Sequence, residues 1–252
     1  MKESKNKLPE SEIVVRGKFF TRLENFWYHY KWAVIGVAFA VIVLTVCLWQ
    51  VFTTDKEDIT LVYAGPVYLS VNETTQLTHV FESVMPYDYD ENGEKTAIVS
   101  MYEIYSEEQI KAFEAKGATN YVDRNRNTSQ YQTYNTYQQT GETSVYLLDP
   151  WLYASIPKEY LCPLSEAMEG VAVQGALEDG YGVRLGDTDL YAEYSVVRLL
   201  PEDTVICLMN PLYWGLGKSK SEEAYDFDVD MFRALVTFER SEESGEDSGA
   251  AA

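Results

Sequence analysis

The hydrophobic pattern of the chain is dominated by one apolar stretch, residues 32–54, which contains no charged side chain. A bilayer core about 30 Å thick needs roughly 20 apolar residues of helix to cross it. A helix also closes its backbone hydrogen bonds within itself, as hydrocarbon requires. Trp32 and Trp49 stand near the two ends, where aromatic side chains gather at membrane interfaces. Residues 32–54 are therefore predicted to form a transmembrane helix in the lipid bilayer rather than a buried core helix.

Cleaved signal peptides and the leader segments of lipoproteins contain similar apolar runs. A cleaved signal peptide has a small-residue site after its apolar core, but here the run is preceded by 31 residues and leaves the core as LWQVF. A lipoprotein has a small residue directly before its lipidated cysteine, whereas Val46 precedes Cys47. The pattern favours an uncleaved signal anchor.

The segment just before the anchor shows a second helical pattern. Apolar and aromatic side chains recur at positions 19, 20, 23, 26, 27 and 30, with Arg22, Glu24 and Asn25 on the opposite side. Residues 18–30 are expected to form a short helix in the membrane interface that continues into the anchor. Residues 1–17 are polar and are expected to be disordered.

After the anchor, short apolar runs alternate with patterns typical of helices. Three capping boxes, each a serine followed three residues later by Glu or Gln, predict helix starts at Ser70, Ser106 and Ser219. The expected strands are residues 59–65, 96–105, 144–148, 183–185, 195–200 and 204–209. The expected helices are one that carries Leu77, Val80, Phe81 and Val84 and ends at Pro86, residues 107–116, part of 118–140, residues 151–156, and one that carries Phe227, Met231, Leu235 and Phe238.

This alternation of strands and helices predicts an α/β fold. Residues 55–240 are expected to form one three-layer domain with a mainly parallel sheet, which is long enough to bury a core. Residues 241–252 form an acidic, small-residue tail that is expected to be disordered. The predicted organisation is thus a head (1–31), an anchor (32–54), an α/β domain (55–240) and a tail.

Charge gives the anchor a direction. Residues 1–31 carry seven Lys/Arg and four Asp/Glu, a net charge of +3. Because the whole chain has a net charge of −20, the remaining residues carry −23. Because positive flanks stay in the cytoplasm, the N-terminus is predicted to be cytoplasmic and the domain extracytoplasmic, at the cell membrane. A body this acidic repels phosphate backbones, which excludes nucleic acid as a partner and favours cationic protein or cell-envelope partners.

Parts of the sequence resemble known families. Tyr63-Ala64-Gly65 at the end of a strand, the strand that ends at Asp149, and the later Cys162-Pro163-Leu164 resemble the first lobe of extracellular solute-binding proteins, over residues 58–165. This resemblance implies a periplasmic-binding-protein-like domain. The body has room for one lobe only, so no ligand residues carry over. Residues 18–65 also resemble uncharacterised single-pass membrane proteins of Gram-positive anaerobes, which implies no activity.

One short motif offers metal ligands. Asp88, Asp90 and Asn92, followed by Gly93, match the start of a calcium loop, with oxygen ligands at positions 1, 3 and 5 and glycine at 6. Val99 stands where such a loop has its glutamate. The alternative is an acidic turn between a helix and a strand, which Asp and Asn-Gly favour without a metal. Calcium is the only cofactor that the sequence suggests.

The sequence gives little support for catalysis. His79 is the only histidine after the anchor, and no nucleophile-elbow or phosphate-loop motif occurs. Cys162 and Cys207 could form a disulfide in an exported domain, or could be two buried thiols, because both have apolar neighbours. Tyr131, Tyr134 and Tyr137 could offer a stacking surface for sugars or a peptide, or could pack against the sheet.

These observations predict a membrane-anchored, non-enzymatic interaction or structural module outside the cytoplasm. The alternative is a membrane-tethered ligand-binding or sensing domain derived from a solute-binding lobe. Such a domain should have a pocket lined by aromatic residues at the carboxyl ends of the strands, around Gly65, Tyr105 and Asp149.

Overall fold

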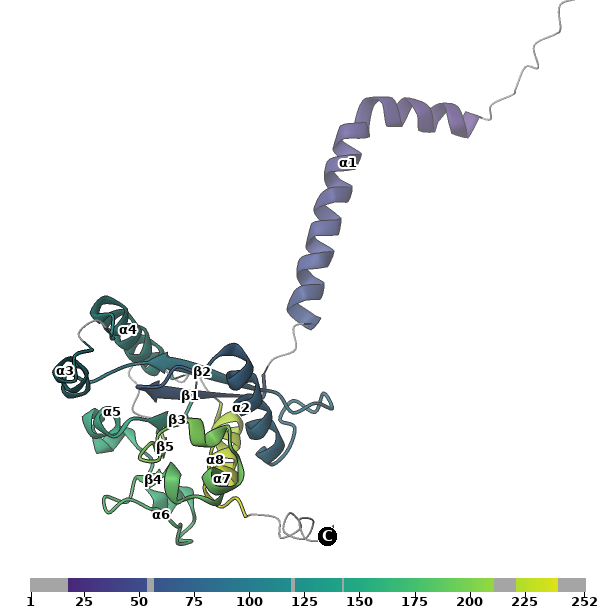
Figure 1. Ribbon diagram of the computed structural model, residues 1–252. Coiled ribbons are helices and arrows are strands. Elements are labelled where there is room, and N and C mark those ends of the chain that lie inside the picture. The colour runs from purple at the N-terminus through teal and green to yellow at the C-terminus, as the bar shows by residue number, and fades with distance from the viewer. Residues whose placement is uncertain (1–17, 54–56, 119–120, 142, 211–220, 240–252) are drawn as a thin grey trace, which may run out of the picture. The chain divides into compact units, whose positions relative to one another are not determined.

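The computed structural model describes residues 18–53, 57–118, 121–141, 143–210 and 221–239 (Figure 1). It contains two compact units, Met1–Asp55 and Lys56–Ala252. The predicted disordered segments, residues 1–17 and 241–252, lie outside the described residues, as does the expected helix cap at Ser219.

The first unit contains one long helix, α1 (Lys18–Thr53), which Figure 1 shows as two arms joined by a bend. Its stretch Phe26–Trp49 is 24 residues long and apolar enough to cross a membrane. Phe39, Ile42 and Leu44 on this stretch are more than half exposed (67%, 61% and 61%), which a lipid-facing helix requires and a buried core helix does not show. The two helices expected in residues 18–54 are thus one continuous helix.

The second unit is built on a mainly parallel sheet of five strands in the order β2-β1-β3-β5-β4. β1 lies between β2 and β3 and is parallel to both, whereas β5 runs antiparallel to β3 and β4. The strands are β1 (Ile59–Gly65), β2 (Ala97–Glu103), β3 (Val145–Leu148), β4 (Gly182–Arg184) and β5 (Val205–Leu208). The structure therefore confirms the α/β class, with one reversed strand inside the sheet.

Helices connect these strands and begin at capped residues. The predicted capping boxes at Ser70 and Ser106 both form, and α8 begins two residues later than expected, with Ser221 as its cap. The α-helices are α2 (Val71–Val84), α3 (Glu107–Ala115), α4 (Arg124–Thr140), α5 (Pro150–Ser155), α6 (Leu164–Ala167), α7 (Asp189–Glu193) and α8 (Glu222–Val236). Short 3₁₀ turns are η1 (Lys158–Tyr160), η2 (Leu185–Asp187) and η3 (Val197–Leu199).

The strand expected at residues 195–200 is wrong. The segment contains η3 instead. Val196, Val197 and Leu200 are buried and Leu199 is exposed, which is the spacing of a helical turn and not the alternation of a strand.

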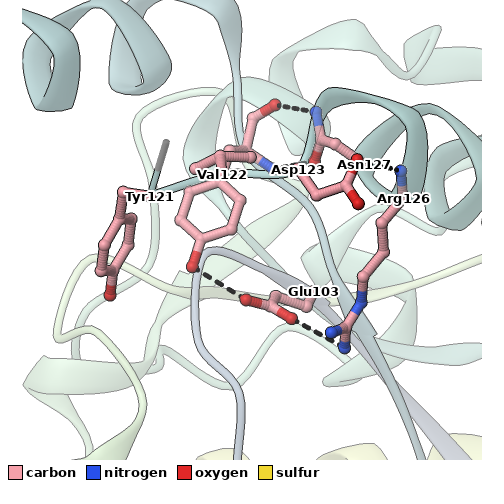
Figure 2. A pocket seen from close by; sticks show the side chains of 7 residues that line it. Glu103, Tyr121, Val122, Asp123, Arg126 and Asn127 are labelled. Atoms are coloured by element: carbon pink, nitrogen blue, oxygen red, sulfur yellow. Dashed lines mark hydrogen bonds and ion pairs between the residues drawn. The ribbon is translucent and has the colours of Figure 1, made fainter. Parts of the chain in front are cut away.

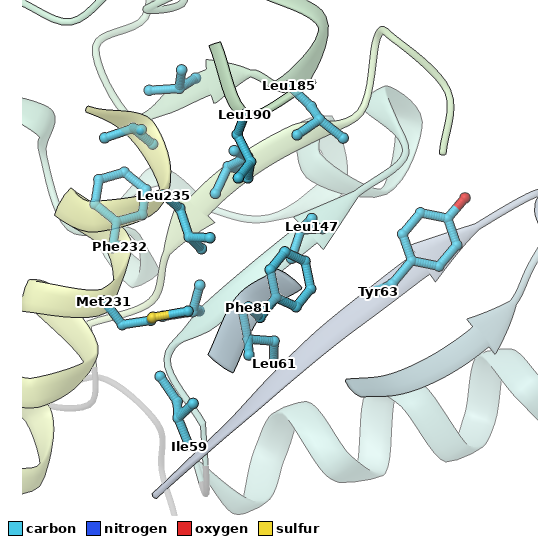
Figure 3. Packing of buried hydrophobic residues seen from close by; sticks show 14 of the residues in the cluster. Ile59, Leu61, Tyr63, Phe81, Leu147, Leu185, Leu190, Met231, Phe232 and Leu235 are labelled. Atoms are coloured by element: carbon cyan, nitrogen blue, oxygen red, sulfur yellow. The ribbon is translucent and has the colours of Figure 1, made fainter. Parts of the chain in front are cut away.

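The larger of two core clusters packs α2, α7 and α8 against one face of the sheet (Figure 3). Leu61 of β1 and Leu147 of β3 lie next to Phe81 of α2, and Tyr63 belongs to the same cluster further along β1. Met231 and Leu235 of α8 are fully buried in the same cluster. Because side chains alternate along a strand, the residues between these ones point to the opposite face.

The second cluster covers that opposite face with α4 and α5. Val62, Tyr146 and Leu148 from the strands pack with Tyr134 of α4 and Leu152 of α5. Tyr134 is only 2% exposed, so the predicted helix within residues 118–140 packs a tyrosine into the core. Helices on both faces of the sheet give the second unit its layered architecture.

Candidate functional site

The carboxyl ends of the parallel strands lie at one edge of the sheet. From β1 the chain passes through α2 to β2 on one side, and it later returns to β3 on the other side of β1. In α/β sheets, ligands bind outside the carboxyl ends of the strands where the strand order reverses in this way. In this chain that point lies between Gly65 and Asp149, and α2, α3 and α5 all begin at the same edge.

The backbone amides at the N-termini of these helices already donate to side chains of the protein. Ser70 and Glu73 cap α2, and Ser106 and Gln109 cap α3, in each case by reciprocal hydrogen bonds. The Asp149 carboxylate accepts the Trp151 amide at 3.1 Å at the start of α5. Because these side chains already occupy helix N-terminal amides, the edge is not arranged to bind a phosphate or carboxylate ligand.

The immediate surroundings of Gly65 and Asp149 are closely packed. The second Asp149 oxygen accepts the Gln109 side-chain amide at 2.9 Å, and burial raises the pKa of this carboxyl. A Cβ atom on Gly65 would lie 2.6 Å from the Tyr63 hydroxyl oxygen. Gly65 is therefore needed for packing. The expected ligand pocket does not centre on these two residues.

The sheet edge has an open groove beside them, which we call the aromatic groove. Its volume is about 590 Å³, and it lies between the end of β2, the start of α3, and side chains of α4 and α5. The lining residues are Ile104, Tyr105, Ser106, Glu107, Glu108, Asn127, Thr128, Tyr131 and Trp151. Tyr105, one of the residues expected around a pocket at the strand ends, thus lines the groove. Trp151, two residues after Asp149, lines it as well.

Two aromatic rings form one wall of the aromatic groove. The rings of Tyr131 and Trp151 are stacked, with centroids 6.0 Å apart and 25° between their planes. The Trp151 indole nitrogen is shielded from solvent and has no hydrogen-bond partner in the described part of the chain. Of the three tyrosines singled out in α4, Tyr131 is half-buried at the groove and Tyr134 belongs to the core.

The other wall is held in place by Asn127 of α4. Its side chain accepts the Tyr105 amide at 2.8 Å and donates to the Tyr105 carbonyl at 3.0 Å. This pair of hydrogen bonds ties the first turn of α4 to the segment just after β2. The aromatic groove is therefore bounded by elements fixed to the sheet, which favours a pre-formed site.

A smaller pocket of about 110 Å³ lies on the far side of Tyr105 and Asn127 (Figure 2). Figure 2 shows the Glu103 carboxylate between two partners: the Arg126 guanidinium at 3.0 Å and the Tyr105 hydroxyl at 3.0 Å. Burial and this hydrogen bond raise the pKa of Tyr105. Because its polar groups already pair with one another, this pocket serves to fix the β2 end against α4.

The calcium candidate lies at the opposite, amino-terminal edge of β1. Asp88 and Asp90 come together with Asp58, and one carboxylate oxygen of each lies within 4.8 Å of the others. The sequence did not single out Asp58, because it stands 30 residues earlier and only the fold brings it there. Asn92 lies beside them: its side-chain amide donates to the Asp90 carboxylate at 3.1 Å, and its side-chain oxygen accepts the Glu94 amide at 2.8 Å.

Several oxygens of this acidic cluster accept backbone amides, whereas one oxygen of Asp88 is buried with no hydrogen-bond partner in the described part of the chain. Asp58, which is 7% exposed, accepts the amides of Tyr89 at 2.9 Å and Thr96 at 2.7 Å. Asp88 accepts the Gly93 amide at 2.6 Å, and this hydrogen bond is the main reason its pKa is lowered. These hydrogen bonds stabilise the turn between α2 and β2. Calcium binding there stays a prediction.

Cys162 and Cys207 are both buried free thiols, the second of the alternatives left open by the sequence. The Cys162 amide donates to the Leu208 carbonyl, so the backbones of the two cysteines lie near each other in space. They nevertheless belong to different core clusters, on opposite faces of the sheet. Side chains that point apart in this way cannot form a disulfide without backbone movement.

His79 and a group of ionisable residues near η1 each pair with neighbouring side chains. His79 is exposed on α2 and its ring nitrogen lies 2.7 Å from Glu82. Outside the aromatic groove, Asp179 accepts the Tyr153 hydroxyl at 2.9 Å and pairs with Lys158, whose ammonium lies 4.0 Å from the centre of the Tyr153 ring. These contacts hold the loop before β4 against η1.

Comparisons with protein-family models, with curated proteins and with solved structures give no match to this chain. Inference about its function therefore starts from the geometry of the aromatic groove and from the apolar helix.

Proposed function

We propose that the chain is a single-pass membrane protein that presents its α/β unit outside the cytoplasm as a non-enzymatic interaction module. The support for anchoring is Phe26–Trp49, a helical stretch long and apolar enough to span a bilayer. The support for the orientation is the charge split, +3 before the apolar run and −23 after its start. In this proposal the specific partner is a protein or another component of the cell envelope.

The observation that carries the interaction role is the aromatic groove. It combines a stacked Tyr131–Trp151 pair with polar and acidic groups, on elements tied to the sheet. Aromatic residues are enriched where proteins bind partners, because they bury a large area with little loss of side-chain freedom. A groove with these properties, which has no His or Cys among its described lining residues, favours binding over catalysis.

Site-specific photo-crosslinking in native cells tests this role. A photo-reactive phenylalanine at Tyr131 lies in the groove, and one at Gln132, which is exposed on the same helix and does not line the groove, serves as the control. We expect a discrete crosslinked product from position 131 and none from position 132. The same products from both positions, or none from either, would contradict an interaction through this groove.

A second candidate function is a membrane-tethered ligand-binding or sensing domain related to one lobe of a solute-binding protein. The place of the aromatic groove favours it, because the groove lies at the carboxyl ends of β2 and β3, next to the reversal of strand order around β1. A small ligand would then fill the groove and a partner would carry the signal across the membrane. Crosslinks from Tyr131 to a protein argue against this candidate, because a small-molecule site leaves no room for a protein segment.

A further inference from the structure

The charges around the aromatic groove have one sign. Among the described residues that line it, the charged ones are Glu107 and Glu108, and none is Lys, Arg or His. The Glu107 carboxylate already pairs with Arg124 at 3.0 Å. The exposed Glu108 carboxylate has no ion pair with a described residue, and Lys111, one turn further along α3, does not line the groove.

The nearby arginines are held away from Glu108 by other acids. Arg124 bridges Glu107 and Glu114, with both distances 3.0 Å, and Arg126 pairs with Glu103 at 3.0 Å. The groove therefore keeps one free negative charge at its rim, within a chain of net charge −20. An acidic surround of this kind raises the local concentration of cationic partners and speeds their association.

The aromatic wall of the groove suits the rest of a cationic side chain. The stacked rings of Tyr131 and Trp151 offer an aromatic face beside Glu108. An ammonium or guanidinium group over such a face is attracted to the ring electrons, while the methylene groups of Lys or Arg pack on apolar surface. The Trp151 indole nitrogen is itself shielded from solvent, so the occupant would contact the ring rather than this N–H group.

We propose that the aromatic groove binds a lysine- or arginine-bearing peptide segment of a partner protein. This inference rests on the interaction role proposed above and names the chemistry of the partner. The cationic side chain pairs with Glu108 and packs on Tyr131 and Trp151. A neutral glycan could also stack on the rings, but it would leave the Glu108 charge without a counterpart.

Binding can be followed on the full chain in nanodiscs of zwitterionic lipid, which does not itself attract cationic peptides. With ¹⁵N-labelled tryptophan the chain gives one indole signal for each of its five tryptophans, and the Trp151 signal is the one lost in Trp151→Phe. The probes are acetyl-Gly-Lys-Gly-Lys-Gly-amide, the same peptide with glutamine in place of lysine, and a tetramer of N-acetylglucosamine. We expect the lysine peptide to shift the Trp151 signal saturably, with the glutamine peptide at least about fivefold weaker.

Matched glutamate variants separate a local contact from the overall charge. Glu108 and Glu223 are both exposed residues in the first turn of a helix, so replacing either by Gln removes the same charge and the same helix-dipole interaction. Glu108→Gln should weaken the lysine peptide about threefold, the size of one exposed ion pair. Glu223→Gln should leave it unchanged.

Equal binding of the two peptides, equal effects of the two glutamate variants, a shift caused only by the tetrasaccharide, or no Trp151 shift with any probe overturns the cationic-peptide inference. None of these results by itself contradicts the interaction role, which stands or falls on the crosslinks from position 131. If position 131 also gives no crosslinked product, both proposals are wrong.

Discussion

At the scale of single residues, the core contains a tyrosine hydroxyl with no hydrogen-bond partner. The Tyr134 oxygen is buried and meets no acceptor or donor in the described part of the chain, and burial raises the pKa of this hydroxyl. An unsatisfied buried hydroxyl lowers stability, because in the unfolded chain it is hydrated. The Tyr134 ring, by contrast, packs at 6.4 Å from the Tyr146 ring and contributes to the second core cluster.

Tyr134→Phe is therefore expected to raise the free energy of unfolding by about 1 kcal/mol, because it removes the hydroxyl and keeps the ring. Tyr134→Ala should lower it by about 3–5 kcal/mol through loss of the ring and the resulting cavity. Urea denaturation measures both. Tyr131→Phe, at a half-buried site, is the control and should change stability by less than about 0.5 kcal/mol. A loss of stability in Tyr134→Phe would show that the hydroxyl has a partner.

The two core thiols lead to a prediction about pH. Burial raises the pKa of both Cys162 and Cys207, so their thiolates form at higher pH than in a free cysteine, whose pKa is about 8.5. Iodoacetamide attacks the thiolate. We therefore expect slow alkylation of the folded protein at pH 8, faster reaction as the pH rises above 9, and rapid reaction at both residues in urea. Peptide mass spectrometry of unreduced protein measures this, and a linked Cys162–Cys207 peptide would contradict it.

At the scale of elements, the connection between α2 and β2 depends on one buried carboxylate. Asp58 stands just before β1 and accepts backbone amides from Tyr89, Asp90 and Thr96, which fixes the acidic loop and the start of β2. These are hydrogen bonds to a carboxylate, which are stronger than neutral ones. Removing the acceptor leaves several donors without a partner at once.

Asp58→Ala should lower the free energy of unfolding by about 3 kcal/mol for this reason. Asp90→Ala, at an exposed residue of the same loop, should lower it by less than about 1 kcal/mol. Chemical denaturation of the two variants beside the wild type gives the comparison. Similar losses in both would show that the loop does not depend on Asp58.

Calcium binding is tested at the same loop by isothermal titration of the wild type and of the double variant Asp88→Ala, Asp90→Ala. If the acidic cluster binds the ion, the wild type should release or absorb heat that the double variant does not. Because the carboxylates already accept backbone amides, the affinity should be weak, about 10⁻⁴–10⁻³ M. A wild-type titration without binding heat would end the calcium hypothesis.

Elements with local signals could be predicted from the sequence, and contacts between distant segments could not. The capping boxes at Ser70 and Ser106 and the strand β1 follow from residues a few positions apart. The reversal of β5, the approach of Asp58 to Asp88, and the stacking of Tyr131 on Trp151 depend on the whole topology. A pocket was accordingly expected at the correct edge of the sheet, where the parallel strands end. It was expected around Gly65 and Asp149, however, and the groove is lined instead by side chains of α4.

At the scale of the whole molecule, the distribution of charge makes the orientation testable. The head carries +3 and the remainder −23, so the positive-inside rule places residue 4 in the cytoplasm and residue 165 outside. Ser4→Cys and Ser165→Cys, each in a Cys47→Ser background, provide matched labels. Ser165 is exposed on α6, and the two remaining native thiols are buried.

A membrane-impermeant maleimide should label Ser165→Cys in intact cells and should label Ser4→Cys only after lysis. Gel shift of the labelled protein measures both. The reverse result would place the α/β unit in the cytoplasm, where a partner would have to be sought. Labelling at neither position before lysis would show that the chain has not inserted in the proposed orientation.

The reversed strand β5 has a consequence for how the protein is made. Because β5 lies between β3 and β4, the edge of β3 cannot be paired until residues 205–208 have emerged, long after β1, β2 and β3. Synthesis at about 5–20 residues per second leaves that edge open for seconds, and an open apolar edge invites pairing with other chains. The domain is therefore expected to reach its native state only after residues 205–208 have been synthesised, and a chain stalled before residue 205 should aggregate or be degraded.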